Sequence, residues 1–221
     1  MGTLILLRHG QSQWNLENRF TGWTDVQLTD QGKGDAAKAA DVIKEYRFDI
    51  AFTSRLIRAN QTLDVILQAL KQTPETIFDS SLNERHYGDL QGLNKAETAE
   101  KYGMEQVQLW RRSYATRPPS GESMEDCERR TLPFFKQYIL PHLVAGKTVI
   151  VVAHGNSLRP IIKHLEHLAP EVAASMEIGL VTPYIYRFEG ETMTQKEVRE
   201  VPGIVTKGAS LTEKKVEGGR V

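Results

Sequence analysis

The order of apolar and polar residues along the chain predicts its main elements. Three short apolar runs with polar flanks, residues 4–7, 50–52 and 149–153, are typical of buried strands. Apolar residues at helical spacing follow each run, and Thr29 is the expected N-cap of the first helix. The expected apolar helix faces are Ala36, Ala40 and Ile43; Ala59, Leu63, Ile66, Leu67 and Leu70; and Leu158, Ile161, Ile162, Leu165 and Leu168.

Strands that alternate with helices are typical of βαβ units. We therefore expect an α/β fold, a three-layer sandwich in which helices flank a mostly parallel central sheet. The alternating segment YIYRF at 184–188 predicts a later strand. The segment TQKEVREV at 194–201 is expected to pair with it across a turn at Gly190.

The chain is expected to hold one catalytic domain, residues 1–202. Its 221 residues are enough for a single domain with a sizeable core. After Pro202 the sequence is rich in glycine and lysine and poor in large apolar residues. We expect residues 203–221 to form a flexible tail and a candidate active-site lid.

Two of the predicted strands end in similar polar sequences. RHG at 8–10 follows the first strand, and AHG at 153–155 ends the third. Ligands bind beyond the carboxyl ends of parallel strands, so we expect His9 and His154 to lie together at that edge of the sheet. The glycine after each histidine lets backbone N–H groups approach a ligand, and the following helix N-terminus favours an anion.

Arginines near the strand ends indicate that this anion is a phosphate. Arg8 precedes His9, and Arg55 and Arg58 lie near the start of the helix after the second strand. Cations at a helix N-terminus oppose the helix dipole, which suggests an anionic partner. The planar guanidinium also fits phosphate oxygens. The alternative for Arg55 and Arg58 is an ordinary surface position.

Two histidines and several arginines around a phosphate suggest covalent catalysis. A neutral imidazole is a competent nucleophile toward phosphorus, and guanidinium groups stabilise charge on the phosphoryl oxygens. The second histidine can donate a hydrogen bond to the transferring group. The leaving oxygen needs a proton, and the candidate donor is Glu84 in the polar segment SLNERHYGDLQG at 81–92.

Charge and cysteine content exclude several classes of protein. Lys plus Arg and Asp plus Glu both number 28, so no overall field favours nucleic acid or an anionic membrane. The first apolar run is too short for a signal peptide or a membrane span. Cys127 is the single cysteine, which excludes an internal disulfide and suits a buried or half-buried helix position in a cytoplasmic protein. His164 and His167 lack a third convergent ligand, so no metal is expected.

These motifs resemble the histidine phosphatase superfamily, and more closely the cofactor-dependent phosphoglycerate mutases. LRHGQS at 7–12 with the distant AHGNS at 153–157 is similar to the general superfamily pattern. The narrower mutase pattern is matched by ENRFTGWTDVQLTDQG at 17–32, SLNERHYGDLQGLNKAETAEKYG at 81–103 and QLWRRSYATRPPSGES at 108–123. In IGLVTP at 178–183, Leu180 and Val181 replace the Thr-Gly that is usual in the family.

The resemblance implies roles for a set of site residues. His9 would be the phosphorylated nucleophile and Glu84 the general acid and base. Arg8, Arg58 and His154 would surround the transferring phosphoryl group. The residues that would contact the substrate or the priming bisphosphate are Ser12, Asn15, Thr21, Gly22, Tyr87, Lys95, Arg111, Arg112, Gly155 and Asn156. From spacing alone, Arg111 and Arg112 also fit a solvated helix end, because usually only one of two adjacent helical residues faces a site.

The implied activity is the metal-independent interconversion of 3-phosphoglycerate and 2-phosphoglycerate, primed by 2,3-bisphosphoglycerate. One alternative is a histidine phosphatase that acts on a small phosphorylated metabolite with the same nucleophile. Another is a non-catalytic protein that binds phosphorylated ligands. The expected partner is a phosphorylated small molecule, with neither nucleic acid nor membrane, and the protein is expected to be a monomer or a homo-oligomer.

Overall fold

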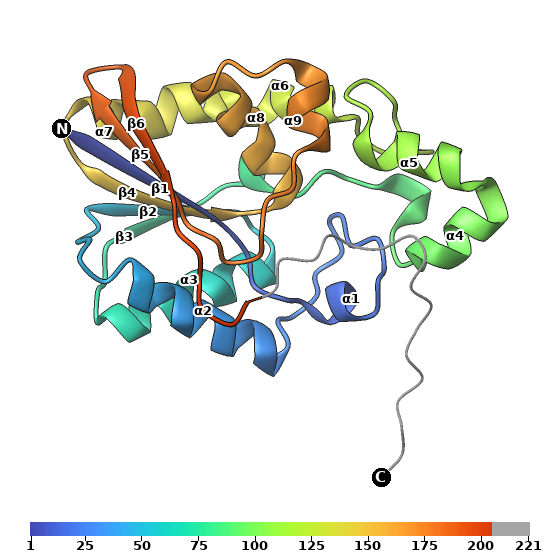
Figure 1. Cartoon of the computed structure of the whole chain (residues 1–221), viewed down its shortest axis with the longest axis horizontal. Helices are drawn as coiled ribbons and strands as arrows, with labels where there is room; N and C mark the ends of the chain where they lie inside the picture. Colours follow the sequence, from blue (N-terminus) through green and yellow to red (C-terminus); the bar gives the residue numbers. More distant parts are fainter. Residues whose placement is uncertain (205–221) are drawn as a thin grey trace, which may run out of the picture.

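A computed structural model describes residues 1–204, which form a six-stranded sheet between two layers of helices (Figure 1). The strands are β1 (Gly2–Arg8), β2 (Ile50–Thr53), β3 (Glu75–Phe78), β4 (Thr148–Ala153), β5 (Tyr184–Glu189) and β6 (Thr192–Val198). They stand in the order β3-β2-β4-β1-β5-β6 across the sheet. This arrangement confirms the predicted α/β sandwich.

The parallel part of the sheet comprises β3, β2, β4 and β1, while β5 and β6 form an antiparallel hairpin beside β1. The five predicted strands are confirmed, including the pairing across Gly190, although β6 ends at Val198 and leaves residues 199–201 of the predicted segment outside it. Strand β3, a four-residue edge strand whose two ends are exposed, was not predicted. Such a segment has too few residues and too little apolar alternation to stand out.

Helices cover both faces of the sheet. The helices of the described residues are α1 (Gln13–Leu16), α2 (Asp30–Val42), α3 (Ile57–Leu70), α4 (Lys95–Tyr102), α5 (Met104–Arg112), α6 (Met124–Phe134), α7 (Leu140–Val144), α8 (Gly155–Leu165) and α9 (Pro170–Ser175). Two 3-10 turns, η1 (Ser80–Leu82) and η2 (Gly88–Leu90), and one π-helical segment, η3 (Phe135–Ile139), complete the described elements. Figure 1 shows α2 and α3 on one face, α6, α7 and α8 on the other, and α4 and α5 out beyond the sheet.

Side chains of β1 alternate between two apolar cores. Ile5 and Leu7 pack with the apolar faces of α2 and α3, whereas Leu4 and Leu6 pack with residues of α6, α7 and α8. All four are fully buried, and each such side chain contributes about 2 kcal/mol through the hydrophobic effect. The strand is therefore held rigidly from both sides up to the residue that precedes His9.

Most predicted helix features are confirmed. The side chain of Thr29 caps α2 by accepting the N–H of Gly32, and Cys127 is buried within α6. Two details were wrong. Helix α8 ends at Leu165, so Leu168 lies in the following loop, where it still packs against the core. Helix α3 begins at Ile57, so Arg55 precedes it and is exposed.

Helices α4 and α5 form a small lobe with its own apolar cluster. Its buried members are Phe20, Leu90, Ala99, Val107 and Trp110. The lobe places cationic side chains opposite the carboxyl edge of the sheet. Of the predicted tail, only Gly203 and Ile204 belong to the described residues, and the predicted lid lies outside them. Within residues 1–204, none of the helices has the length and apolar character that crossing a membrane requires.

Candidate active site

The two histidines meet where the sequence predicts, at the carboxyl edge of the sheet. Strands β1 and β4 pair in register up to Arg8 and Ala153, and the N–H of His9 donates to the carbonyl of Ala153 (3.0 Å). The imidazole centroids of His9 and His154 lie 5.0 Å apart. Parallel pairing of two strands thus brings together residues far apart in the sequence.

The hydrogen bonds of His9 define its tautomer. Its Nδ1 lies 2.7 Å from the carbonyl oxygen of Gly10, which can only accept, so Nδ1 carries the proton. Nε2 makes no hydrogen bond within the described part of the chain. Burial, followed by the positive charges of Arg58 and Arg8, holds the pKa of His9 well below its usual range. The ring is therefore neutral, with the Nε2 lone pair available.

Close packing fixes the peptide next to this histidine. The N–H of Gly10 donates to Thr62 Oγ1 (3.0 Å), and the Thr62 hydroxyl donates to the carbonyl of Arg58 (2.7 Å). A Cβ atom at Gly10 would lie 2.5 Å from the carbonyl oxygen of Gly32 in α2. Glycine at position 10 thus allows α2 to approach the loop that holds the His9 ring.

His154 lies behind His9 and is completely buried. Its Nε2 is 2.8 Å from the hydroxyl of Ser54, the residue that follows β2. Ser54 Oγ also accepts the N–H of Leu56 (3.1 Å). The other ring nitrogen of His154, Nδ1, is buried and has no hydrogen-bond partner within residues 1–204. Burial and the charge of Arg58 hold the pKa of His154 well below its usual range.

Arg8 and Arg58 flank the histidines, and each has a buried Nε–H without a partner among the described residues. Arg8 donates through Nη1 to the carbonyl of Ile178, and Arg58 donates to the carbonyls of Thr24 and Gly22. Burial lowers the pKa of Arg58 to about 10, so this guanidinium stays cationic at neutral pH. An anion between the two arginines would satisfy the unpaired donors.

Glu84 lies in the loop between η1 and η2, and one of its two carboxylate oxygens accepts hydrogen bonds from the described residues. Oε1 accepts the N–H groups of Arg85 (2.8 Å) and Asn156 (3.1 Å), while Oε2 accepts none from the described residues. Arg130 fixes the loop by donating to the carbonyls of Asn83 and Glu84 (both 2.9 Å). Glu84 thus lines the pocket with one carboxylate oxygen that accepts no hydrogen bond from the described residues.

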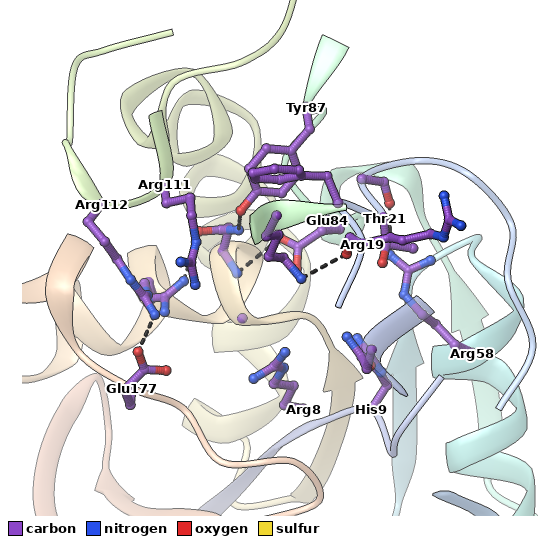
Figure 2. Close-up of a pocket in the computed structure, with 17 residues that line it drawn as sticks. Arg8, His9, Arg19, Thr21, Arg58, Glu84, Tyr87, Arg111, Arg112 and Glu177 are labelled. Carbon is purple, nitrogen blue, oxygen red and sulfur yellow. Dashed lines mark hydrogen bonds and ion pairs between the residues drawn. The ribbon is translucent and has the colours of Figure 1, made fainter. Parts of the chain in front are cut away.

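A second group of cations, Lys95, Arg111 and Arg112, comes from the α4–α5 lobe. Arg85 ties this lobe to the Glu84 loop by donating to the carbonyls of Trp110 and Arg111, at the end of α5. Lys95 is buried and donates to the carbonyl of Arg19 (2.8 Å). Burial, followed by the charges of Arg111 and Arg8, lowers the pKa of Lys95 to about 7. The pocket thus has cations on two sides (Figure 2).

Thirteen of the fifteen predicted site residues line this one pocket. Both Arg111 and Arg112 are among them, so these two residues face the pocket and do not form a solvated helix end. The two exceptions are His154, which lies behind His9, and Ser12. The Ser12 hydroxyl is buried and donates to Asn15 Oδ1 in the capping box of α1. This hydrogen bond holds the side chain of Asn15 in place. Arg55, which the sequence analysis left open, does not line the pocket.

Four residues that line the pocket were not predicted, namely Arg19, Phe20, Arg159 and Glu177, nor was Ser54, which contacts His154. Arg159 had a usable signal, because it lies one helical turn after Gly155 and so shares its face of α8. Ser54 also had one, since it follows a parallel strand at the same edge as the histidines. Glu177 had none, because its place depends on contacts distant in sequence.

Residues 4–200 match the histidine phosphatase superfamily (branch 1), and the chain belongs to that superfamily. Relatives with about half of their residues identical to this chain are named as one kind of enzyme within that superfamily. A protein of Nitrobacter hamburgensis named 2,3-bisphosphoglycerate-dependent phosphoglycerate mutase is 52% identical over 191 residues, 85% of this chain and 92% of the relative. One of Gloeobacter violaceus, named 2,3-bisphosphoglycerate-dependent phosphoglycerate mutase 2, is 51% identical over 192 residues, 86% of this chain and 88% of the relative.

Solved structures show the same fold. YhfR of Bacillus stearothermophilus superposes with a TM-score of 0.78 at 26% identity and covers 92% of this chain and 97% of its own. A mycobacterial glucosyl-3-phosphoglycerate phosphatase superposes with a TM-score of 0.76 at 24% identity, over 90% of this chain and 97% of its own. The α/β sandwich is therefore shared well beyond the mutases.

Proposed function

We propose that this protein interconverts 3-phosphoglycerate and 2-phosphoglycerate through a phosphohistidine at His9, primed by 2,3-bisphosphoglycerate. The observation that carries the proposal is the arrangement of charge in the pocket. One group of cations, Arg8 and Arg58, flanks the nucleophile, and Lys95, Arg111 and Arg112 form a separate group. Two groups of cations suit a ligand with two anionic ends. The names of relatives about half identical to this chain support the same substrate.

The residues fit the bisphosphate. The buried, unpaired Nε atoms of Arg8 and Arg58 and the unpaired Nδ1 of His154 are donors suited to phosphoryl oxygens. Lys95, Arg111 and Arg112 would hold the carboxylate or the second phosphate. The pocket thus offers cations to both phosphate groups of the bisphosphate.

In the first half of the reaction, His9 Nε2 attacks a phosphorus atom of the bound 2,3-bisphosphoglycerate. The P–N bond forms as the bond between phosphorus and the ester oxygen breaks, and Glu84 Oε2 gives its proton to that oxygen. Arg8 and Arg58 stabilise the negative charge on the equatorial oxygens. In the second half, a hydroxyl of the bound phosphoglycerate attacks the phosphohistidine. Glu84 takes the proton of this hydroxyl, a new P–O bond forms and the P–N bond breaks. Glu84 recovers its proton in each cycle.

Ser54 sets the tautomer of His154. Ser54 Oγ accepts the N–H of Leu56, and its hydroxyl hydrogen has no acceptor other than His154 Nε2 among the described residues, so we assign the Ser54 hydroxyl as the donor to Nε2. The proton of the neutral ring then lies on Nδ1, where it can be donated to the phosphoryl group. Nitrogen-15 NMR of the native protein is expected to show His154 protonated at Nδ1. Ser54→Ala should weaken that preference and lower kcat about tenfold, the loss of one hydrogen bond. A native ring protonated at Nε2 would contradict this assignment.

Lys95 makes ligand affinity depend on pH. With a pKa of about 7 in the free protein, Lys95 is half neutral at pH 7. A bound anion raises this pKa, so binding above pH 7 takes up a proton. Affinity for 3-phosphoglycerate should therefore fall by up to about tenfold per pH unit between pH 7 and 9. Calorimetry in buffers of different ionisation enthalpy would measure the proton uptake.

The matched control for Lys95→Met is Lys101→Met, at an exposed position on the same helix. Lys95→Met should abolish the proton uptake, whereas Lys101→Met should keep it. Proton uptake that persists in Lys95→Met would assign it to another group.

Phosphorus NMR of 3-phosphoglycerate with purified protein and a chelator tests the proposed function. A signal of 2-phosphoglycerate that requires a trace of 2,3-bisphosphoglycerate is expected. Release of inorganic phosphate alone would instead identify a phosphatase with the same nucleophile, and no change would leave a binding protein. We place this reaction in the cytoplasm, which suits a chain with a single, buried, unpaired cysteine.

A further inference from the structure

Glu177 places a carboxylate in a pocket otherwise dominated by cations. The pocket lining includes seven arginine or lysine side chains and two carboxylates, Glu84 and Glu177. Glu84 serves in proton transfer, whereas Glu177 has no part in the chemistry proposed above. Its negative charge opposes the binding of an anionic ligand. The presence of this carboxylate at the site therefore requires another explanation.

The carboxylate of Glu177 forms an ion pair with Arg112. Figure 2 shows this pair on the side of the pocket away from His9 and Arg58. Arg112 is mostly buried, with 18% of its side chain exposed, whereas 52% of the Glu177 side chain is exposed. The glutamate thus has room to move into solvent, while the arginine stays in the wall of the pocket.

The backbone on both sides of Glu177 is held by the arginines of the pocket. Arg159 donates to the carbonyl of Met176 (2.8 and 3.0 Å), and Arg8 donates to the carbonyl of Ile178 (3.0 Å). The N–H of Val181 donates back to the carbonyl of Arg8 (3.0 Å). These contacts fix the position from which the Glu177 side chain reaches Arg112, so the ion pair is a built feature of the free site.

We propose that Glu177 is a specificity-determining residue that occupies Arg112 until the far anionic group of a ligand displaces it. A ligand with two anionic groups exchanges the internal ion pair for its own contact with Arg112. A ligand with one anionic group binds beside His9 and leaves the pair intact. Glu177 therefore weakens the binding of two-group ligands selectively, which favours their release after each turnover. The identity of these ligands rests on the proposed function.

Calorimetry with Glu177→Gln tests this competition. The probes are 3-phosphoglycerate, with two anionic groups, and inorganic phosphate, with one. The variant is expected to bind 3-phosphoglycerate about two- to fivefold more tightly, the range of a partly exposed ion pair, and inorganic phosphate almost unchanged. Glu171→Gln, at an exposed position of α9, is the matched control and should change neither affinity. In an Arg112→Ala background, Glu177→Gln should give no gain.

The opposite result is as informative. If Glu177 merely positions Arg112, Glu177→Gln will bind 3-phosphoglycerate more weakly, and the competition is overturned. Equal tightening toward both probes would also overturn it, because that result reports the general field of the carboxylate. Binding needs no turnover, so a selective gain in a protein without mutase activity would support the competition while the proposed function fails.

Discussion

Replacement of His9 by alanine is expected to lower kcat by at least about 10⁴-fold, because the variant lacks the nucleophile that we propose forms the covalent intermediate. The hydrogen bonds of the two rings support His9 rather than His154 for this proposed role. The Nδ1–H of His9 donates to the carbonyl oxygen of Gly10, so the lone pair of Nε2 is free, and His9 lines the pocket. His154 lies behind it and is engaged by Ser54.

Labelling with phosphorus-32 measures this effect directly. Native protein incubated with labelled 2,3-bisphosphoglycerate should carry an acid-labile phosphoryl group, and His9→Ala should carry none. His142→Gln, outside the pocket, should label like the native protein. His154→Ala should still label, at a reduced rate. Acid-labile label on His9→Ala would mean that another residue is the nucleophile.

Replacement of Glu84 by glutamine is expected to lower kcat for phosphoglycerate by about 10² to 10⁴-fold, the usual contribution of a general acid and base. Glutamine keeps the shape of the side chain and can still accept the N–H groups of Arg85 and Asn156 through its amide oxygen. It cannot deliver a proton to an alkoxide. The loss should therefore be in the chemistry rather than in substrate binding.

A change of leaving group separates these two effects. Para-nitrophenolate leaves without a proton, so formation of the phosphoenzyme from p-nitrophenyl phosphate should be almost unaffected in Glu84→Gln. Asp89→Asn, a nearby exposed acid that accepts a hydrogen bond from Ser120, is the matched control. An equal loss with both substrates would show that Glu84 acts on binding or on the local structure instead.

The sheet and the catalytic edge could be predicted because their signals are local. Apolar runs of four or five residues predict strands β1 and β4, and the His-Gly sequence at each end then places His9 and His154 at the same edge. Residues of the α4–α5 lobe gave no such signal by themselves. Lys95 and Arg111 were predicted only from the resemblance, because a lysine or arginine on a short helix is usually a surface charge.

The segment before β5 shows the limit of sequence reasoning. Val181 is fully buried and adopts φ = 47°, in the left-handed region that favours glycine. The resemblance places a glycine there, and the backbone keeps that conformation although a β-branched residue occupies it. The N–H of Val181 and the side chain of Arg8 hold the segment in place. Only the folded chain reveals that this segment brings Glu177 to the pocket.

The position of β1 in the sheet has a consequence for synthesis of the protein. Both neighbours of β1 in the sheet, β4 and β5, come from the last third of the chain. About 140 residues must be translated after β1 before β4 exists, which takes about 7 to 28 s at about 5 to 20 residues per second. During that time the most apolar stretch of the N-terminus has no sheet partner and is exposed to aggregation. Among the four parallel strands, the one that precedes His9 thus stays without a sheet partner for the longest part of synthesis.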